Sequence, residues 1–130
     1  NYIPKNNRSQ IVKTKKNTII LDAYNANPSS MKAMLNSFSN QHYKNKLCIL
    51  GDMLELGNES NKEHLDIINL TNTLRLDCLF ICEIFNSLTN NSFKNKLDLE
   101  KHIHENNIQK KTILLKGSRG IGLEELVVIL

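Results

Sequence analysis

The chain contains no tryptophan, and aromatic residues of all kinds make up only 5% of it. Aliphatic side chains must therefore fill its core. Proteins that bind single-stranded nucleic acid stack bases on aromatic side chains, and no segment here alternates aromatic with basic residues. The net charge is +4, but the lysines are spread from Lys5 to Lys116. We therefore expect no nucleic-acid partner and a mild positive field that suits an anionic nucleotide or a phosphorylated substrate.

Cysteine is also scarce, and its three copies form no framework. Cys48 and Cys78 lie in apolar runs typical of buried strands, and the spacing from Cys78 to Cys82 is not CxxC. No histidine cluster completes a metal site, so we predict no metal ligands. An odd cysteine count suits a reducing compartment.

Long apolar runs are missing as well. None approaches the roughly 18 to 20 residues that a membrane span needs, so we expect no membrane span. The chain opens with Asn-Tyr-Ile-Pro-Lys, which is not typical of a signal peptide and looks like the middle of a protein. A cytoplasmic protein is the expectation.

Short β-branched runs alternate with amphipathic stretches, a pattern that predicts an α/β fold. At 130 residues the chain has the usual size of one domain, and we expect residues 1–130 to form it. The fold we predict is a three-layer sandwich: a mostly parallel sheet with an N-terminal antiparallel hairpin strand. We expect strands at 11–12, 18–21, 46–50, 78–82 and 112–115, and helices at about 30–38, 60–74, 97–106 and 122–130.

For two of the predicted helices, the sequence also indicates which residues face the core. Ser29 or Ser30 is expected to cap the first helix. The apolar face of this helix begins at Met31 and recurs at i+3, i+4 and i+7. In the second, Leu65 and Ile68 are expected to face inward.

Three polar segments follow predicted parallel strands, at 22–30, 51–57 and 116–120. The carboxyl ends of parallel strands meet at one edge of a sheet, where ligands of open α/β folds bind. We therefore expect a binding site at this edge. Asp22 is suited to a ribose hydroxyl, although a turn is the more common role of such a residue. Asn25, Asn27 and Ser29 suit amide recognition and helix capping equally well.

The other two segments have competing interpretations too. Asp52 and Glu55 suit an acid–base pair, but a solvated loop is favoured for them. Lys116, Ser118 and Arg119 belong to a segment that resembles an anion nest, in which backbone N–H groups and two cations hold a carboxylate or phosphate. Neither a P-loop nor a GxGxxG fingerprint is present. We assign no chemistry to the four scattered histidines.

Taken together, these segments resemble a known family. Its matching strings are Asn-Asn-Arg-Ser-Gln at 6–10, Asp-Ala-Tyr-Asn-Ala-Asn-Pro at 22–28, Gly-Asp-Met-Leu-Glu-Leu-Gly at 51–57 and Lys-Gly-Ser-Arg-Gly at 116–120. They are similar, in order and over nearly the whole chain, to the C-terminal domain of the MurF branch of the Mur ligases. That resemblance implies a Rossmann-like domain in a three-domain enzyme that adds D-alanyl-D-alanine to UDP-MurNAc-tripeptide with ATP.

The resemblance also implies roles for individual residues. ATP phosphorylates a carboxylate, and the dipeptide amine attacks the acyl phosphate. Arg8 and Asp22 would contact the nucleotide. The residues that would border the substrates are Asn25, Asn27, Ser29, Asp52, Lys116, Ser118 and Arg119. ATP and Mg²⁺ would be held mainly by a central domain that this chain lacks, so we expect the chain to fold alone, to contain no catalytic residue of its own and to be inactive.

The sequence departs from the family at Cys82-Glu83-Ile84, where relatives often carry a glycine. Two other functions compete with the ligase domain. A free-standing nucleotide-binding Rossmann-like module is opposed by the missing glycine fingerprint. A basic nucleic-acid-binding domain is opposed by dispersed charge and few aromatic residues.

Overall fold

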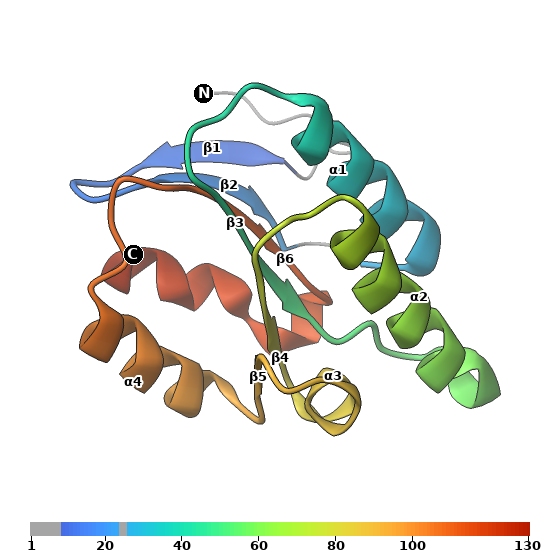
Figure 1. Cartoon of the computed structure of the whole chain (residues 1–130). Coiled ribbons are helices and arrows are strands. Elements are labelled where there is room, and N and C mark those ends of the chain that lie inside the picture. The colour runs from blue at the N-terminus through green and yellow to red at the C-terminus, as the bar shows by residue number, and fades with distance from the viewer. Residues whose placement is uncertain (1–8, 24–25) are drawn as a thin grey trace.

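The structure, a computed structural model, describes residues 9–23 and 26–130 and has a six-stranded sheet between two layers of helices (Figure 1). The sheet order is β1-β2-β6-β3-β4-β5, and only the β1–β2 pair is antiparallel. The strands are β1 (Gln10–Lys13), β2 (Thr18–Asp22), β3 (Lys46–Gly51), β4 (Cys78–Ile81), β5 (Ser92–Phe93) and β6 (Thr112–Lys116). This Rossmann-like sandwich, with its N-terminal hairpin, confirms the predicted fold class.

Helices cover both faces of the sheet, as Figure 1 shows. The α-helices are α1 (Pro28–Asn40), α2 (Ser60–Thr73), α3 (Glu83–Leu88) and α4 (Lys96–Asn106). Three 3₁₀ helices complete the described elements: η1 (Gly57–Glu59), η2 (Arg119–Ile121) and η3 (Leu123–Ile129). The helices α1, α2 and α3 pack on one face, and α4 and η3 pack on the other.

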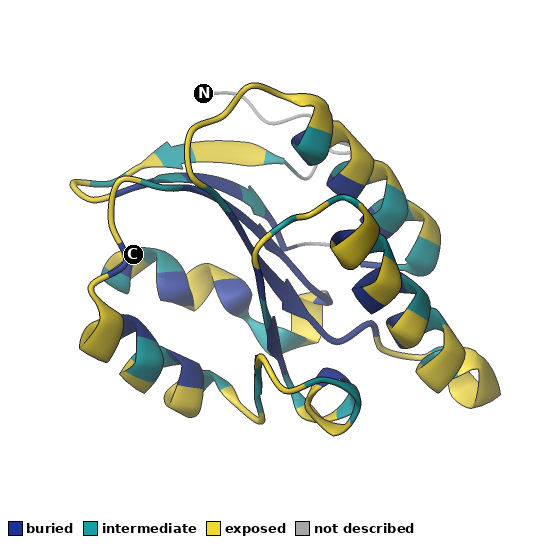
Figure 2. Ribbon diagram, viewed as in Figure 1, coloured by how far each residue is buried: buried dark blue, intermediate teal, exposed yellow. Residues whose placement is uncertain are grey.

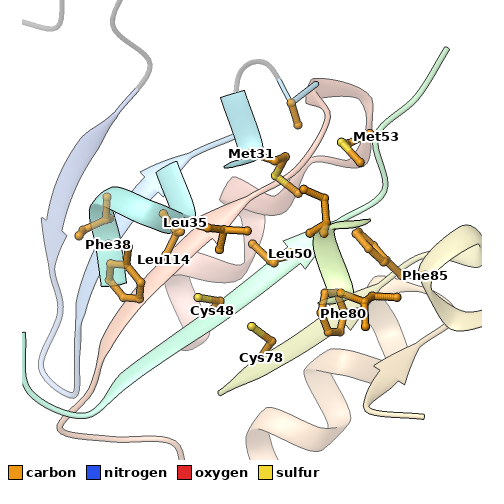
Figure 3. Packing of buried hydrophobic residues seen from close by; sticks show 14 residues of the cluster. Met31, Leu35, Phe38, Cys48, Leu50, Met53, Cys78, Phe80, Phe85 and Leu114 are labelled. Atoms are coloured by element: carbon orange, nitrogen blue, oxygen red, sulfur yellow. The ribbon is translucent and has the colours of Figure 1, made fainter. Parts of the chain in front are cut away.

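Alternate side chains of each central strand pack in two separate hydrophobic cores, one on each face of the sheet. On the β3 strand, Cys48 and Leu50 face α1 and α2, whereas Leu47 and Ile49 face α4 and η3. Figure 3 shows the first core, in which Met31 and Leu35 lie over Leu50. Figure 2 shows the central strands as the most buried part of the molecule. Both faces are apolar because both are covered, as is usual for parallel sheets.

Two details of the helices differ from expectation. The cap of α1 is Asn27, not Ser29 or Ser30, because its Oδ1 accepts the Ser30 N–H at 2.8 Å and Pro28 suits the first helical position. In α2, Leu65 is 41% exposed and does not face inward. The buried row of that helix is His64, Ile67, Ile68 and Thr71.

The segment after β4 contains two elements that the sequence pattern does not predict, α3 and β5. Both are short and carry little apolar periodicity. The helix that the sequence predicts at 122–130 is present, and it is the 3₁₀ helix η3. Its β-branched Val127 and Val128 disfavour an α-helix, and a repeat of three places Leu123 and Leu126 on the same buried face.

No helix within the described part of the chain is long and apolar enough to cross a membrane.

Candidate functional site

The candidate site lies at the carboxyl ends of β3 and β6, which are neighbours in the sheet. After β3 the chain continues into α2 on one face of the sheet, and after β6 it continues into η3 on the opposite face. Such a reversal opens a crevice at the end of an α/β sheet. Gly51 and Gly117 make the two strand ends approach closely, since a Cβ on Gly117 would lie 3.0 Å from the Gly51 Cα and 2.7 Å from Leu123 Cδ1.

Asp22 and Lys116 end the adjacent parallel strands β2 and β6 and face each other in register. The Lys116 Nζ donates to Asp22 Oδ2 at 2.9 Å, and the two side chains are 1% and 9% exposed. Both residues belong to the strands, whereas the sequence pattern placed them just beyond. A buried charge needs a partner, and each of these residues supplies one to the other. The pair therefore ties the ends of two of the three predicted segments together.

Asp52 follows β3 directly, and its carboxylate holds the start of α3. Its Oδ2 accepts the Ile84 N–H at 2.9 Å and its Oδ1 accepts the Phe85 N–H at 3.0 Å. Burial raises the pKa of this carboxyl above its ordinary value, although the two backbone hydrogen bonds oppose the effect. The favoured interpretation of a solvated loop is wrong for Asp52, which is buried, and holds for Glu55, which is exposed.

Ser118 fastens the end of β6 to the segment after β3. Its Oγ accepts the Leu54 N–H at 3.0 Å, and its own N–H donates to the Asp52 carbonyl at 3.3 Å. This side chain is buried. Ser118 thus holds two of the predicted segments in one fixed arrangement.

His64, from α2, also fixes the segment that follows β3. Its Nδ1 lies 2.7 Å from the Ser60 carbonyl, which only accepts, so Nδ1 carries the proton. The Nε2 then accepts the Met53 N–H at 2.9 Å. The imidazole is fully buried and meets the Phe85 ring edge-on, with the centroids 4.6 Å apart. Sequence reasoning gave His64 no role, and only its position i+4 from Ser60 in a helix hinted at one.

The loop before α1 is only partly described. Asn27 caps α1, and the Ser30 Oγ accepts the Asn27 N–H at 3.1 Å, which completes a capping box. The capping role considered for Asn27 is therefore confirmed. Ser29 is exposed in the first turn of α1. Arg8 and Asn25 lie outside the described residues.

A hollow of about 530 Å³ opens beside the ends of β3 and β6. Asp52 and Leu54 from the segment after β3 line it, together with Gly120 after β6. Its other side is formed by residues that sequence reasoning missed: Cys82, Glu83, Lys94, Asn95, Lys96 and Ile121. Ile121 follows Gly120 in η2, and the others belong to the connections around α3 and β5, which the pattern did not predict. Arg119 is exposed at the start of η2, next to Gly120.

Cys82 stands at the border of this hollow in a backbone conformation that suits glycine. Its φ is 93° and its ψ is 174°, a region that only glycine occupies without strain. A glycine, which the family resemblance led us to expect in this segment, would adopt this conformation without strain. Burial, and then the nearby Asp52 carboxylate, raise the pKa of the Cys82 thiol to about 11. The thiol is accordingly protonated at neutral pH.

Among the described residues, no group of three or more His, Cys, Asp or Glu side chains is arranged to hold a metal ion.

Comparison with known proteins agrees with this geometry. The family profile described as Mur ligase, glutamate ligase domain, matches residues 7–119. The UDP-N-acetylmuramoyl-tripeptide–D-alanyl-D-alanine ligase of Rickettsia prowazekii is 31% identical over 129 residues, which are 92% of this chain and 29% of that protein. The ligase of the same name from Bacillus subtilis is 34% identical over 134 residues, with the same coverages of 92% and 29%.

Solved structures lead to the same family. MurF from Acinetobacter baumannii superposes with a TM-score of 0.78 at 26% identity, over 96% of this chain and 30% of that one. MurF from Thermotoga maritima, in complex with ADP, has the same fold, with a TM-score of 0.76 at 19% identity over 94% of this chain and 30% of that one. This chain spans less than a third of the length of these relatives. It belongs to the Mur ligase family and corresponds to the C-terminal domain of the MurF ligases.

Proposed function

We propose that this chain is the C-terminal domain of an ATP-dependent ligase that adds D-alanyl-D-alanine to UDP-MurNAc-tripeptide. In this proposal the domain closes over the nucleotide and the substrates during the reaction. The observation that carries the proposal is the rim at the ends of β2, β3 and β6. Polar residues from all three segments interlock there beside an open hollow. The names of the relatives supply the substrates, and their similarity extends over 92% of the chain.

The nucleotide would meet this domain near Asp22, together with Arg8, when the domain closes. The Asp22 Oδ2 is held by Lys116 and the side chain is 9% exposed, so its orientation is set before any ligand arrives. Preorganised charge of this kind is more effective than charge that must reorient. A relative of the same fold was solved with ADP, which supports ATP as the nucleotide.

The dipeptide would bind beside the hollow that Asp52, Leu54 and Gly120 line. Asn27, Asp52, Lys116 and Ser118 have side-chain atoms engaged within the domain, so their contribution is to shape this rim. Arg119 and Ser29 are exposed at the rim, and Asn25 completes the set of predicted substrate residues. The Arg119 guanidinium matches a carboxylate, which makes the C-terminus of the dipeptide its proposed partner.

Magnesium would enter with ATP. The described residues offer no cluster of carboxylates that fits a divalent cation, since Asp22 is held by Lys116 and Asp52 by the α3 amides. We therefore propose that the ion and most ATP contacts belong to the rest of the enzyme. Bound there, Mg²⁺ would neutralise phosphate charge during transfer, and this domain would contribute positioning alone.

A domain exchange tests the proposal. The matching part of the Bacillus subtilis ligase is replaced by this chain, and phosphate release is measured with ATP, UDP-MurNAc-tripeptide and D-alanyl-D-alanine. The expected result is release that requires both substrates, with the amide product identified by mass spectrometry. The chain alone should release no phosphate from ATP. A chimera that melts cooperatively yet forms no product under any of these conditions contradicts the proposed function.

Two arginine variants of the chimera test the dipeptide contact. Arg119→Ala should raise the KM for D-alanyl-D-alanine by about 10- to 100-fold, as expected for the loss of one charge-assisted hydrogen bond. Arg75→Ala is the matched control, since Arg75 is exposed in the turn that precedes β4, at the amino end of the strands. Equal KM values for the two variants would rule out a role for Arg119 in binding the dipeptide.

A further inference from the structure

Five lysines, widely separated in the sequence, meet around a hollow of about 420 Å³ at the amino end of the sheet. This end is opposite the rim described above. The lysines come from three connections: β1 to β2, α1 to β3, and α4 to β6. Figure 1 shows these three connections gathered at the end of the sheet away from η2. The five residues are Lys15, Lys16, Lys44, Lys110 and Lys111.

The described residues that line the hollow carry a strongly positive charge. No Asp or Glu is among the described residues that line it. In the described part of the chain, the four ion pairs use Lys32, Lys62, Lys96 and Lys116, none of which belongs to the hollow. Five of the 17 basic residues of the chain are thus concentrated at one site. A concave surface of one charge sign focuses the field and attracts ions of the opposite sign.

The backbone beneath the lysines is held rigidly. The Lys110 N–H donates to the Lys16 carbonyl at 2.6 Å, and the Thr18 N–H donates to the Lys111 carbonyl at 2.9 Å. Buried Asn17 accepts the Lys111 N–H with its Oδ1 at 3.1 Å and donates with its Nδ2 to the Ile108 carbonyl at 3.2 Å. Hydrogen bonds therefore fix the backbone that carries the lysines, and binding an anion would not require the loops to order first.

One of the five lysines occupies a conformation that its side chain disfavours. Lys110 has a φ of 58°, in the left-handed region where glycine or asparagine is usual. Asn45, whose Nδ2 donates to the Lys110 carbonyl at 3.0 Å, is also left-handed but is a residue that tolerates it. Strained residues of this kind often accompany binding sites.

From this geometry we infer that the hollow binds a compact anion with two or more phosphate groups. A concave site with several ammonium groups suits a pyrophosphate group, because lysine ammonium groups act as point charges toward phosphate oxygens. The site is independent of the proposed function: it shares no residue with the rim, and it can be occupied while the rim is occupied. The phosphate groups could belong to a soluble ligand or to an anionic lipid headgroup, and the experiment separates these sources.

The test uses the whole chain, labelled with ¹⁵N, and inorganic pyrophosphate as the probe at low ionic strength. We expect amide shifts at Lys16, Asn17, Lys44 and Lys111, with a Kd on the order of 0.1 to 1 mM that weakens as salt is added. Vesicles of cardiolipin, whose headgroup carries two phosphate groups, mixed with phosphatidylcholine form the second arm, with binding measured by sedimentation. Binding in either arm that depends on the lysines of the hollow supports the inference, and the stronger arm identifies the source.

Matched variants separate the hollow from general charge. Lys44→Gln/Lys111→Gln should weaken binding about 10-fold or more, whereas Lys32→Gln/Lys101→Gln, which removes the same charge elsewhere, should weaken it less than about 2-fold. Lys110→Gly removes one charge and relieves the left-handed strain, so it should weaken binding without lowering the melting temperature.

Three outcomes would overturn the inference. The first is equal weakening by the two double variants, which would show only general attraction. The second is the absence of amide shifts at the hollow together with the absence of vesicle binding. The third is binding of a single-stranded oligonucleotide that strengthens with length and is not displaced by pyrophosphate, which would make the surface a nucleic-acid site.

Discussion

The Lys116 Nζ lies 2.9 Å from the Asp22 Oδ2, and this ion pair joins the last residues of two parallel strands that are 94 positions apart in the chain. The two side chains are almost inaccessible to solvent. Each charge is therefore acceptable only in the presence of the other. Asp22 belongs to the proposed nucleotide contact, and its carboxylate is oriented by Lys116 within the domain itself.

Breaking this pair should destabilise the domain severely. Lys116→Met leaves the Asp22 carboxylate buried without its partner, and we expect a loss of about 3 to 5 kcal/mol in the free energy of unfolding. The double variant Asp22→Leu/Lys116→Met removes both charges and should recover most of that loss. Urea denaturation of both proteins and the wild type measures the difference. A Lys116→Met protein as stable as the wild type would show that the ion pair contributes nothing to the fold.

The close approach of β3 and β6 should make Gly117 intolerant of any side chain. A Cβ there would meet the Gly51 backbone at 3.0 Å and Leu123 at 2.7 Å, so Gly117→Ala should cost about 1 to 3 kcal/mol through overpacking. Gly120→Ala is the control, because its Cβ would meet only the Leu54 side chain, at 3.6 Å. Thermal melts of the two variants should differ clearly, and similar melting temperatures would contradict the proposed packing of the rim.

The backbone of Cys82 favours glycine, and two substitutions can isolate this effect. Cys82→Gly and Cys82→Ala both remove the thiol, but only alanine retains a Cβ at a φ of 93°. We expect Cys82→Gly to be more stable than Cys82→Ala by about 1 kcal/mol, after the greater flexibility of glycine in the unfolded chain is subtracted. Chemical denaturation measures both values. If alanine proved as stable as glycine, the conformation at residue 82 would not be strained.

The Cys82 thiol should react slowly at neutral pH. Its pKa is raised from 9.0 to about 11, so its thiolate fraction near pH 7.5 should be about 100-fold smaller than that of an ordinary cysteine. Iodoacetamide labelling between pH 7 and 11, located by peptide mass spectrometry, tests this. Cys48 and Cys78 are buried and serve as internal unreactive sites. Labelling of Cys82 at pH 7.5 as fast as that of free cysteine would contradict the raised pKa.

The same pKa determines the sign of a stability effect. Because the folded value lies above the ordinary one, the contribution of Cys82 to stability is complete below about pH 9 and declines as the pH rises toward 11. Cys82→Ala should lose this decline between pH 9 and 11, which denaturation curves at several pH values can detect.

Much of the fold could be predicted from the sequence because the signals are local. The apolar runs at β2, β3 and β6 are short and β-branched, and they alternate with a helical face such as that of Met31, Leu35 and Phe38. Backbone hydrogen bonding and burial of such runs leave few other arrangements. The polar segments at the strand ends could also be located, since parallel strands all end at one edge.

Weak local signals account for the parts that could not be predicted. The helix α3 begins at Glu83 and is short, and it is held by the Asp52 carboxylate from the end of another strand. The cap at Asn27 competed with two serines that are equally good capping residues by type. For α3 the deciding hydrogen bonds come from a distant strand end, whereas for α1 a local hydrogen bond decided between residues of equal capping type.

The sequence alone therefore determined the class of fold, the order of its longer elements and the edge at which polar residues gather, because these follow from periodicity within short windows. The tertiary structure decided which of those residues remain available to a ligand. It pairs Asp22 with Lys116, commits Asp52 to α3 and gathers five scattered lysines at the opposite end. These relationships join positions far apart in the chain, and only the packing of the strands brings them within the few ångströms over which charges and hydrogen bonds act.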